Sequence, residues 1–137
     1  AAFSRATATD EKERGTLGMT LQPPMSFSNG FELMALLTMG HFLGDFGLQS
    51  DRMAREKCPG CSSTLPWQWW LTSHAAIHGF LVAWITGIPA LGLAEWGAHT
   101  LIDLGKCQNR YRLGVDQALH LLCKVAWIAL MPQAWTP

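Results

Sequence analysis

The sequence is poor in charged residues and has no net charge. Asp, Glu, Lys and Arg make up only 15% of its 137 residues, and ten basic residues balance ten acidic ones. No basic surface is therefore available for nucleic acid, and we expect no nucleic-acid partner. Long apolar stretches, such as 80–88 and 121–131, also lack the charged outer face that each helix of a water-soluble four-helix bundle requires. We therefore predict that the protein is embedded in a lipid membrane.

Four apolar segments predict transmembrane helices, at about 29–50, 67–86, 89–105 and 111–131. Each has roughly 17 to 22 residues, enough to cross a bilayer core of ~30 Å. Ser28 or Asn29 is a suitable N-cap for the first, and Gly105 a suitable end for the third. Gly87, Ile88 and Pro89 predict a tight turn between the second and third. We predict an all-α integral membrane bundle of four transmembrane helices over 27–133, after a polar tail, 1–26, that lacks the apolar run of a secretory signal.

The basic residues of two loops predict the orientation. The connection between the second and third helices has no basic residue, and neither has the stretch after the fourth. The positive-inside rule then places both basic loops in the cytoplasm and both termini on the non-cytoplasmic side of a bacterial inner membrane. The residues responsible are Arg52, Arg55 and Lys57 in the first loop, and Lys106, Arg110 and Arg112 in the other.

Each of the four segments carries one pair of metal-ligand residue types spaced four positions apart. Residues i and i+4 lie on the same face of a helix, so each segment directs two such side chains the same way. All five histidines belong to these pairs, and the helical rise places all eight residues in one leaflet. The pairs are His41/Asp45, His74/His78, His99/Asp103 and Asp116/His120.

These polar residues predict a shared site inside the bundle. An ionised Asp facing lipid would cost about 2.5–3.5 kcal/mol, so the pairs must face one another. Eight nitrogen and oxygen donors suit one or two divalent ions such as Zn, Fe or Mn, and the absence of Cys from the pairs argues against a soft metal. A purely structural polar network, a proton path and a pigment site remain alternatives.

Further polar residues extend the same helix faces. Glu95 precedes His99 by one turn, and Lys124 follows His120 by one turn. Glu95 is a candidate general base if the site is catalytic, or else the partner of Lys124 in an ion pair within the membrane. Gln49 and Gln117 are candidates to orient the ligands through hydrogen bonds.

Cysteines and glycines give weaker signals. Cys58 and Cys61 form a C-x-x-C in the first basic loop, and Cys107 lies in the other. They are compatible with part of a zinc site, with a redox pair or with free thiols, and we favour free thiols. Gly40 and Gly44 form a G-x-x-x-G that predicts close helix contact beside the first pair.

Four strings resemble a family of small bacterial and phage membrane proteins known only as a domain of unknown function. They are GHFLGDFGLQSD (40–51), HAAIHG (74–79), HTLID (99–103) and DQALHLL (116–122). This resemblance implies four transmembrane helices over roughly 31–131 and no particular activity. The chain is more loosely similar to predicted membrane-bound metal-dependent hydrolases, which also present His and Asp on short transmembrane helices.

Three functions are compatible with these features. The first is a metal-dependent hydrolase of phosphoester or lipid-linked substrates, in which two ions activate water. The second is a non-catalytic accessory or structural subunit of a larger membrane complex, such as an energy-transducing one, or of a homo-oligomer. A transporter of protons or divalent metal ranks third, because four short helices form a poor alternating-access device.

Overall fold

The computed structural model describes residues 29–131, which are helical with no strand. This confirms the all-α prediction, whereas the predicted polar tail over 1–26 lies outside the described residues. The elements are α1 (Gly30–Phe42), the π-helix η1 (Leu43–Gly47), α2 (Asp51–Glu56), α3 (Trp67–Thr86), α4 (Pro89–Cys107) and α5 (Leu113–Leu130).

The first predicted helix is interrupted. It begins as expected at Asn29, whose side chain accepts a hydrogen bond of 3.0 Å from the backbone N–H of Glu32. A single helix as far as residue 50 is wrong, however, because α1 passes into the π-helix and a separate short helix, α2, follows. Single π-helical turns are frequently found at functional sites, and this one carries Asp45.

The second and third helices form the predicted antiparallel hairpin. Gly87 ends α3 with a left-handed φ of 69°, and Pro89 occupies the first turn of α4. The predicted end of α4 at Gly105 is wrong, since the helix continues to Cys107. Gly105 instead leaves room for the Tyr111 ring, which a Cβ at this position would overlap.

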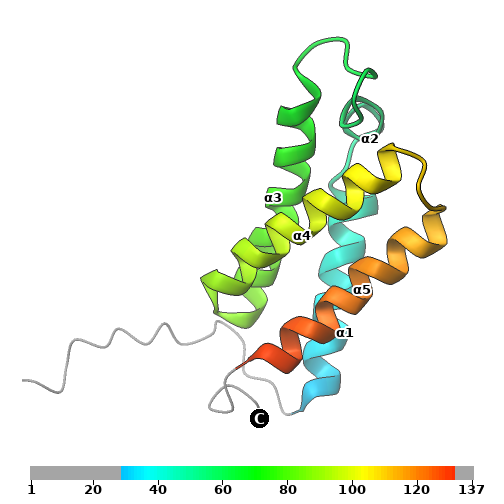
Figure 1. The fold of residues 1–137 in the computed structure, drawn as a ribbon. Coiled ribbons are helices and arrows are strands. Elements are labelled where there is room, and N and C mark those ends of the chain that lie inside the picture. The colour runs from blue at the N-terminus through cyan, green and yellow to red at the C-terminus, as the bar shows by residue number, and fades with distance from the viewer. Residues whose placement is uncertain (1–28, 132–137) are drawn as a thin grey trace, which may run out of the picture.

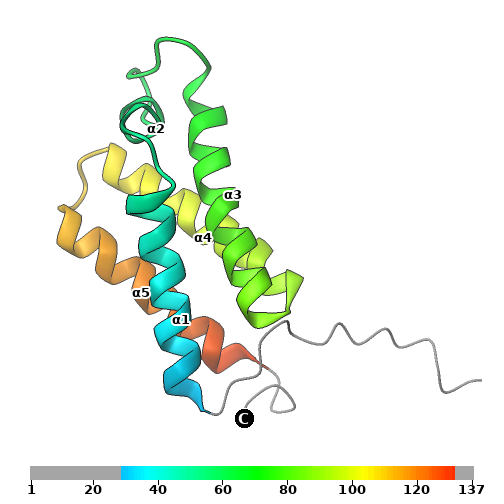
Figure 2. The same ribbon diagram turned by 180° about the vertical axis from the view of Figure 1, so that it is seen from behind.

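The long helices alternate in direction, as Figures 1 and 2 show from opposite sides. The start of α1, the α3–α4 turn and the end of α5 lie at one end. The short helix α2, the loop after it and the α4–α5 connection lie at the other. Both basic loops therefore share one end of the bundle, which we call the loop end.

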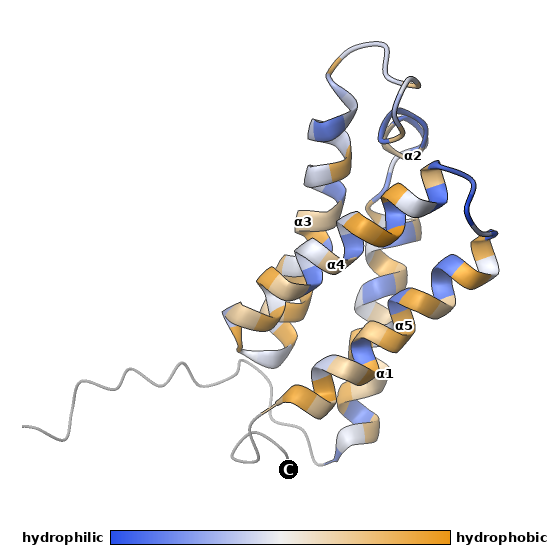
Figure 3. Cartoon of the chain, in the orientation of Figure 1, coloured by the Kyte–Doolittle hydropathy of each residue, from blue (hydrophilic) through white to orange (hydrophobic). Residues whose placement is uncertain are grey.

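The interior is unusually polar. Among the described residues, twelve polar or charged residues are buried beside eight apolar ones. Hydrophilic residues gather at α2 and the α4–α5 connection, whereas α5 and the parts of α3 and α4 beside their turn are largely hydrophobic (Figure 3). An apolar core occupies the end opposite the loop end and comprises Leu33, Leu37, Val82, Ile85, Leu91 and Met131.

Of the described helices, only α5 is both long enough and apolar enough to cross a membrane. Over Leu113–Leu130 its mean hydropathy is 1.4, and 17% of this window is buried. The histidines and other polar residues on α3 and α4 lower the hydropathy of those helices. One helix of this length and composition is weak evidence for a membrane location, since the core helix of a soluble protein meets the same two criteria.

Substituting Gly92 by alanine is expected to destabilise the α3–α4 hairpin by about 1–3 kcal/mol. A Cβ at Gly92 would lie 2.6 Å from the Gly79 backbone oxygen, and one at Gly79 would lie 2.7 Å from that of Gly92. The two backbones must therefore separate. Chemical unfolding in detergent, followed by circular dichroism, measures the change.

Gly97→Ala is the matched control for Gly92→Ala. Gly97 lies in the same helix, but a Cβ added there meets no atom within 4 Å. Alanine at this position should be neutral or stabilise the helix by up to about 1 kcal/mol. Equal stability of the two variants would contradict the close approach of α3 and α4.

Candidate metal centre

All eight predicted ligand residues are brought together inside the bundle. Seven are buried, and Asp45 is partly buried. They form three overlapping groups in which one ligand atom per residue lies within 4.8 Å of the others, so that each group could hold a metal ion. The groups are Asp45, His74, His78 and His99; His41, His99 and His120; and Asp103, Asp116 and His120.

In the first group, three imidazole nitrogens surround the Oδ1 atom of Asp45. The Nε2 atoms of His74 and His78 lie 3.3 and 3.1 Å from it, and that of His99 lies 3.8 Å from it. The Nε2 atoms of His74 and His99 are 3.2 Å apart. Zinc bonds of about 2.0–2.1 Å in tetrahedral geometry place ligand atoms roughly 3.3 Å apart, so these spacings match a three-nitrogen, one-oxygen site.

Several atoms of the cluster are buried without a hydrogen-bond partner. They include Asp45 Oδ1 and His78 Nε2, which lie 3.1 Å apart without normal hydrogen-bond geometry. Asp116 Oδ1 and His120 Nε2 are also buried and have no hydrogen-bond partner. Buried polar atoms in native proteins nearly always have a partner, and each exception needs an explanation. A cation bound between these atoms would satisfy them.

The carboxylate of Asp103 lies between the first and third groups. Its Oδ2 atom is 3.5 Å from His74 Nε2 and 3.7 Å from His99 Nε2, whereas its Oδ1 atom is 3.7 Å from His120 Nε2. The Oδ1 atom of Asp116 is also 3.7 Å from His120 Nε2. This arrangement suits a carboxylate that bridges two ions.

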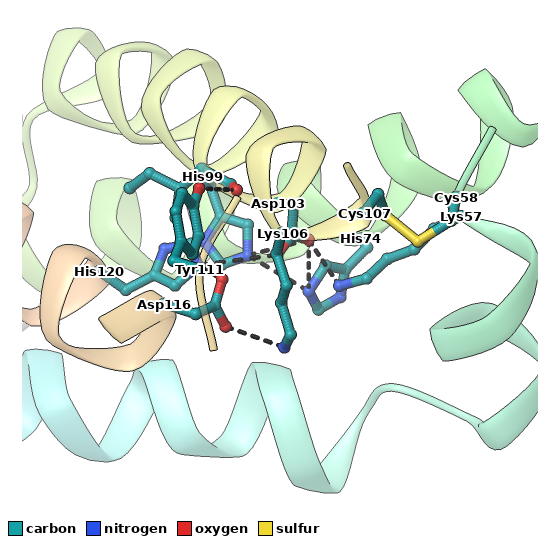
Figure 4. Close-up of a disulfide and its surroundings, with 11 residues drawn as sticks. Lys57, Cys58, His74, His99, Asp103, Lys106, Cys107, Tyr111, Asp116 and His120 are labelled. Carbon is teal, nitrogen blue, oxygen red and sulfur yellow. Dashed lines mark hydrogen bonds and ion pairs between the residues drawn. A yellow bond between two sulfur atoms is a disulfide. The ribbon is translucent and has the colours of Figure 1, made fainter. Parts of the chain in front are cut away.

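Two lysines at the loop end, which the sequence indicated only as orientation signals, reach into the cluster. Lys57 follows α2, and Lys106 lies in the last turn of α4. Lys57 Nζ lies 2.6 Å from Asp103 Oδ2, and Lys106 Nζ lies 2.9 Å from Asp116 Oδ2 (Figure 4). Their charges balance two of the three carboxylates of the cluster. Spacing along one helix does not indicate this role, because Lys57 is 46 positions from Asp103, and Lys106 and Asp116 lie on different helices.

The two glutamines lie beside the ligands, as predicted. Gln117 donates to Asp45 Oδ2 at 2.6 Å, and its own oxygen lies 3.1 Å from His41 Nε2. With its amide oriented to suit its neighbours, Gln49 donates to the Asp45 backbone oxygen at 3.2 Å and accepts from Lys57 Nζ at 2.8 Å. Both side chains therefore fix the orientation of ligand residues.

Glu95 lies behind the cluster and forms the predicted ion pair with Lys124. Both side chains are 1% exposed. The Glu95 carboxylate also accepts from Trp127 Nε1 at 2.6 Å and lies 3.3 Å from His99 Nδ1. The contact with Nδ1 leaves His99 Nε2 directed toward Asp45. The role of Glu95 as a general base stays a prediction.

Gly40 in α1 and Gly44 in the π-helix allow the cluster to form. A Cβ at Gly44 would overlap the His78 ring, and one at Gly40 would lie 3.1 Å from Ile85 Cδ1. Both glycines thus face α3, which confirms the close contact predicted from the G-x-x-x-G. At Gly44 this contact brings His78 up to the π-helix that carries Asp45.

Glu56 organises the loop after α2, a role that the sequence did not indicate. Its carboxylate accepts hydrogen bonds from the hydroxyl groups of Ser63 and Thr64, at 2.8 Å each, and from Arg52 and Trp70, at 3.0 Å each. The bond from Ser63, together with the others, holds the pKa of Glu56 well below its ordinary value. The loop that carries Cys58 and Cys61 is therefore fixed to the end of α2.

Substituting Glu56 by glutamine is expected to loosen this loop. Glutamine turns one acceptor oxygen into an N–H group that faces donors, so backbone amides of 57–66 should exchange faster with deuterium. Because the folded-state pKa is lowered, the stabilisation is full above the ordinary Glu pKa of about 4.3 and is lost as pH falls toward the lowered value. The difference in free energy of unfolding between the native protein and the Glu56→Gln variant should accordingly shrink below about pH 4. A difference independent of pH would contradict this role.

The cysteines differ from the prediction of free thiols. Cys58 and Cys107 form a disulfide that joins the end of α4 to the loop after α2 (Figure 4). Cys61 is free and exposed, and Cys123 is free within α5. The C-x-x-C spacing was compatible with a zinc site, a redox pair or free thiols, but it did not indicate that Cys58 would bond to Cys107.

Comparison with known proteins places the chain in a family without assigning an activity. No curated protein and no solved structure shows significant similarity to it. A family model described as "protein of unknown function (DUF3307)" matches residues 33–136, which include every residue of the cluster. The match covers most of the chain, and the protein therefore belongs to the DUF3307 family.

Proposed function

We propose that this protein is a membrane-embedded metal protein whose His/Asp cluster binds one or two divalent ions of Zn, Fe or Mn. The arrangement around Asp45 carries the proposal. Three imidazole nitrogens lie 3.1–3.8 Å from one carboxylate oxygen that is buried and has no hydrogen bond. An ordinary polar network would pair the Asp45 oxygen and His78 Nε2 through hydrogen bonds, whereas an ion bound between them accounts for the lack of one.

The exposed apolar residues support a multi-pass membrane location. Large hydrophobic side chains that are 62–81% exposed occur on all four long helices, among them Phe31, Phe80, Leu93, Leu101, Leu122 and Leu130. Such residues are rarely gathered on a soluble monomer, and a lipid bilayer accommodates them. The basic loop end then faces the cytoplasm of a bacterial cell, and the opposite end faces the other side of the inner membrane.

A metal-dependent hydrolase of phosphoester or lipid-linked substrates is the activity that this geometry supports best. Two ions bridged by Asp103 would activate water and hold the phosphate oxygens. A cavity of about 470 Å³ lies at the loop end, lined in part by Gln49, Lys57, Lys106 and Tyr111. Because both lysines also contact cluster carboxylates, this cavity adjoins the centre.

Elemental analysis of the detergent-purified chain, beside an Asp45→Ala/Asp103→Ala variant, tests the metal centre. We expect one or two equivalents of Zn, Fe or Mn in the native chain and none in the folded variant. Equal metal content in both would overturn the ligand assignment, and no metal in either would overturn the metal centre.

An absorption spectrum and the subunit composition of the same preparation test the alternative function. A pigment band, or another subunit retained at fixed stoichiometry, would favour the accessory-subunit function.

The hydrolase activity needs a separate measurement. Metal-loaded protein should cleave a chromogenic phosphodiester or phosphomonoester, and a chelator should abolish the cleavage. Bound metal without cleavage of either ester would support the proposed metal centre but contradict the proposed hydrolase activity.

A further inference from the structure

Three of the four cysteines gather at the loop end, apart from the metal ligands. The Cα atoms of Cys58 and Cys107, joined by the disulfide, are 5.2 Å apart. Cys61 carries a free, exposed thiol. All three line the same cavity of about 470 Å³, so an accessible thiol and a disulfide share one space.

The Cys58–Cys61 turn brings these two residues together. The backbone N–H of Cys61 donates to the Cys58 oxygen at 3.1 Å, and Gly60 adopts a φ of 81°, which glycine allows. Cysteines in C-x-x-C motifs readily form a disulfide with each other. Cys58 therefore has two available partners: Cys107, to which it is bonded, and Cys61, three residues along the chain.

The predicted orientation places this disulfide in the cytoplasm. Cytosolic disulfides are rare, and those that occur are usually transient, catalytic or redox-sensing. A merely structural bond would not require a free cysteine beside it. An accessible thiol next to a disulfide is, by contrast, the arrangement that thiol–disulfide exchange needs.

We propose that Cys58, Cys61 and Cys107 form a thiol–disulfide exchange site whose external substrate is a dithiol. The Cys61 thiolate attacks Cys58 Sγ, a Cys58–Cys61 bond forms, and the Cys58–Cys107 bond breaks. Cys107 leaves as a thiolate and takes up a proton equivalent to the one Cys61 lost, so this step involves no net oxidation. An external dithiol then reduces the Cys58–Cys61 disulfide to two thiols and is itself oxidised to a disulfide.

The exchange bears directly on the metal centre. Lys57 and Lys106 precede the two bonded cysteines, and their ammonium groups contact Asp103 and Asp116 (Figure 4). The disulfide thus holds two lysines against two cluster carboxylates. Release of Cys107 would free the α4–α5 connection from the α2 loop and open this side of the cluster.

The rate at which the Cys107 thiol appears tests the proposal in the full-length protein. The chain is purified without reductant and incubated at about pH 8.5, near the ordinary pKa of a cysteine thiol. Samples are quenched with excess maleimide at successive times, so that Cys107 is labelled only once it has been released. Mass spectrometry then gives the connectivity. We expect the native chain to release Cys107 both without added dithiol and, faster, with dithiothreitol. In Cys61→Ser, both rates should fall at least tenfold.

Two further variants keep the test falsifiable. Cys107→Ser should contain a Cys58–Cys61 disulfide and show faster deuterium exchange over 105–112 than Cys61→Ser. Cys123→Ser removes the remaining cysteine, in α5, and should behave as the native chain. The proposal is overturned if the native chain lacks the Cys58–Cys107 bond, or if Cys61→Ser releases Cys107 within twofold of the native rate. Failure of Cys107→Ser to form the Cys58–Cys61 bond would overturn it equally.

Discussion

Substitution of Asp45 by asparagine is expected to weaken binding of the first metal ion by more than about a hundredfold. Loss of a group that merely orients a ligand typically lowers metal affinity 10- to 100-fold, so loss of a ligand charge should exceed that range. Asparagine keeps the shape of the side chain but removes the negative charge that three imidazoles face. Competition with a chromogenic zinc chelator, in detergent, measures the affinity.

Two variants set the scale for Asp45→Asn. Gln117→Leu removes the amide that donates to Asp45 Oδ2 at 2.6 Å but leaves every proposed ligand in place. It should therefore lower the affinity by only about 10- to 100-fold. Asp51→Asn removes a carboxylate from an exposed residue at the start of α2 and should leave the affinity unchanged. Asp45→Asn and Asp51→Asn with equal affinities would exclude Asp45 as a ligand.

The ligand residues were predictable because their pairing is local. Spacing of four residues on a helix fixes a shared face, and the predicted cost of exposing charge to lipid indicated that all four faces turn inward. The structure accordingly gathers all eight residues, and α3 has the bounds that its sequence predicts, 67–86. The same reasoning placed Glu95 beside Lys124, since each extends the polar face of its helix by one turn.

Features that depend on contacts between distant segments were not predictable in this way. Lys57 balances Asp103 only because the chain after α2 packs against α4, and Lys106 balances Asp116 only because the end of α4 lies beside the start of α5. Gly105 resembled a helix end, yet it accommodates the ring of Tyr111 from the following connection. No residue composition marks the π-helix at Asp45, so the sequence did not predict it. The close contact of Gly44 with His78 lies in the same π-helix.

Substitution of Glu95 by alanine is expected to lower the free energy of unfolding by about 3–5 kcal/mol. Glu95 is the counter-ion of Lys124, and each side chain is 1% exposed. Alanine would leave a buried ammonium group without a partner, together with the Trp127 N–H that donates to the carboxylate. Denaturant unfolding in detergent micelles measures this loss.

The double variant Glu95→Leu/Lys124→Met separates stability from ligand positioning. Replacing both members of a buried ion pair by apolar residues of similar volume is often neutral or stabilising, so most of the lost stability should return. Glu95→Ala should also lower the metal affinity, because the Glu95 carboxylate 3.3 Å from His99 Nδ1 fixes the His99 ring. The double variant still lacks this carboxylate, so its metal affinity should not return. If the double variant regained both, Glu95 would act only as the counter-ion of Lys124. If it regained neither, the buried charge of Lys124 would not be the source of the destabilisation.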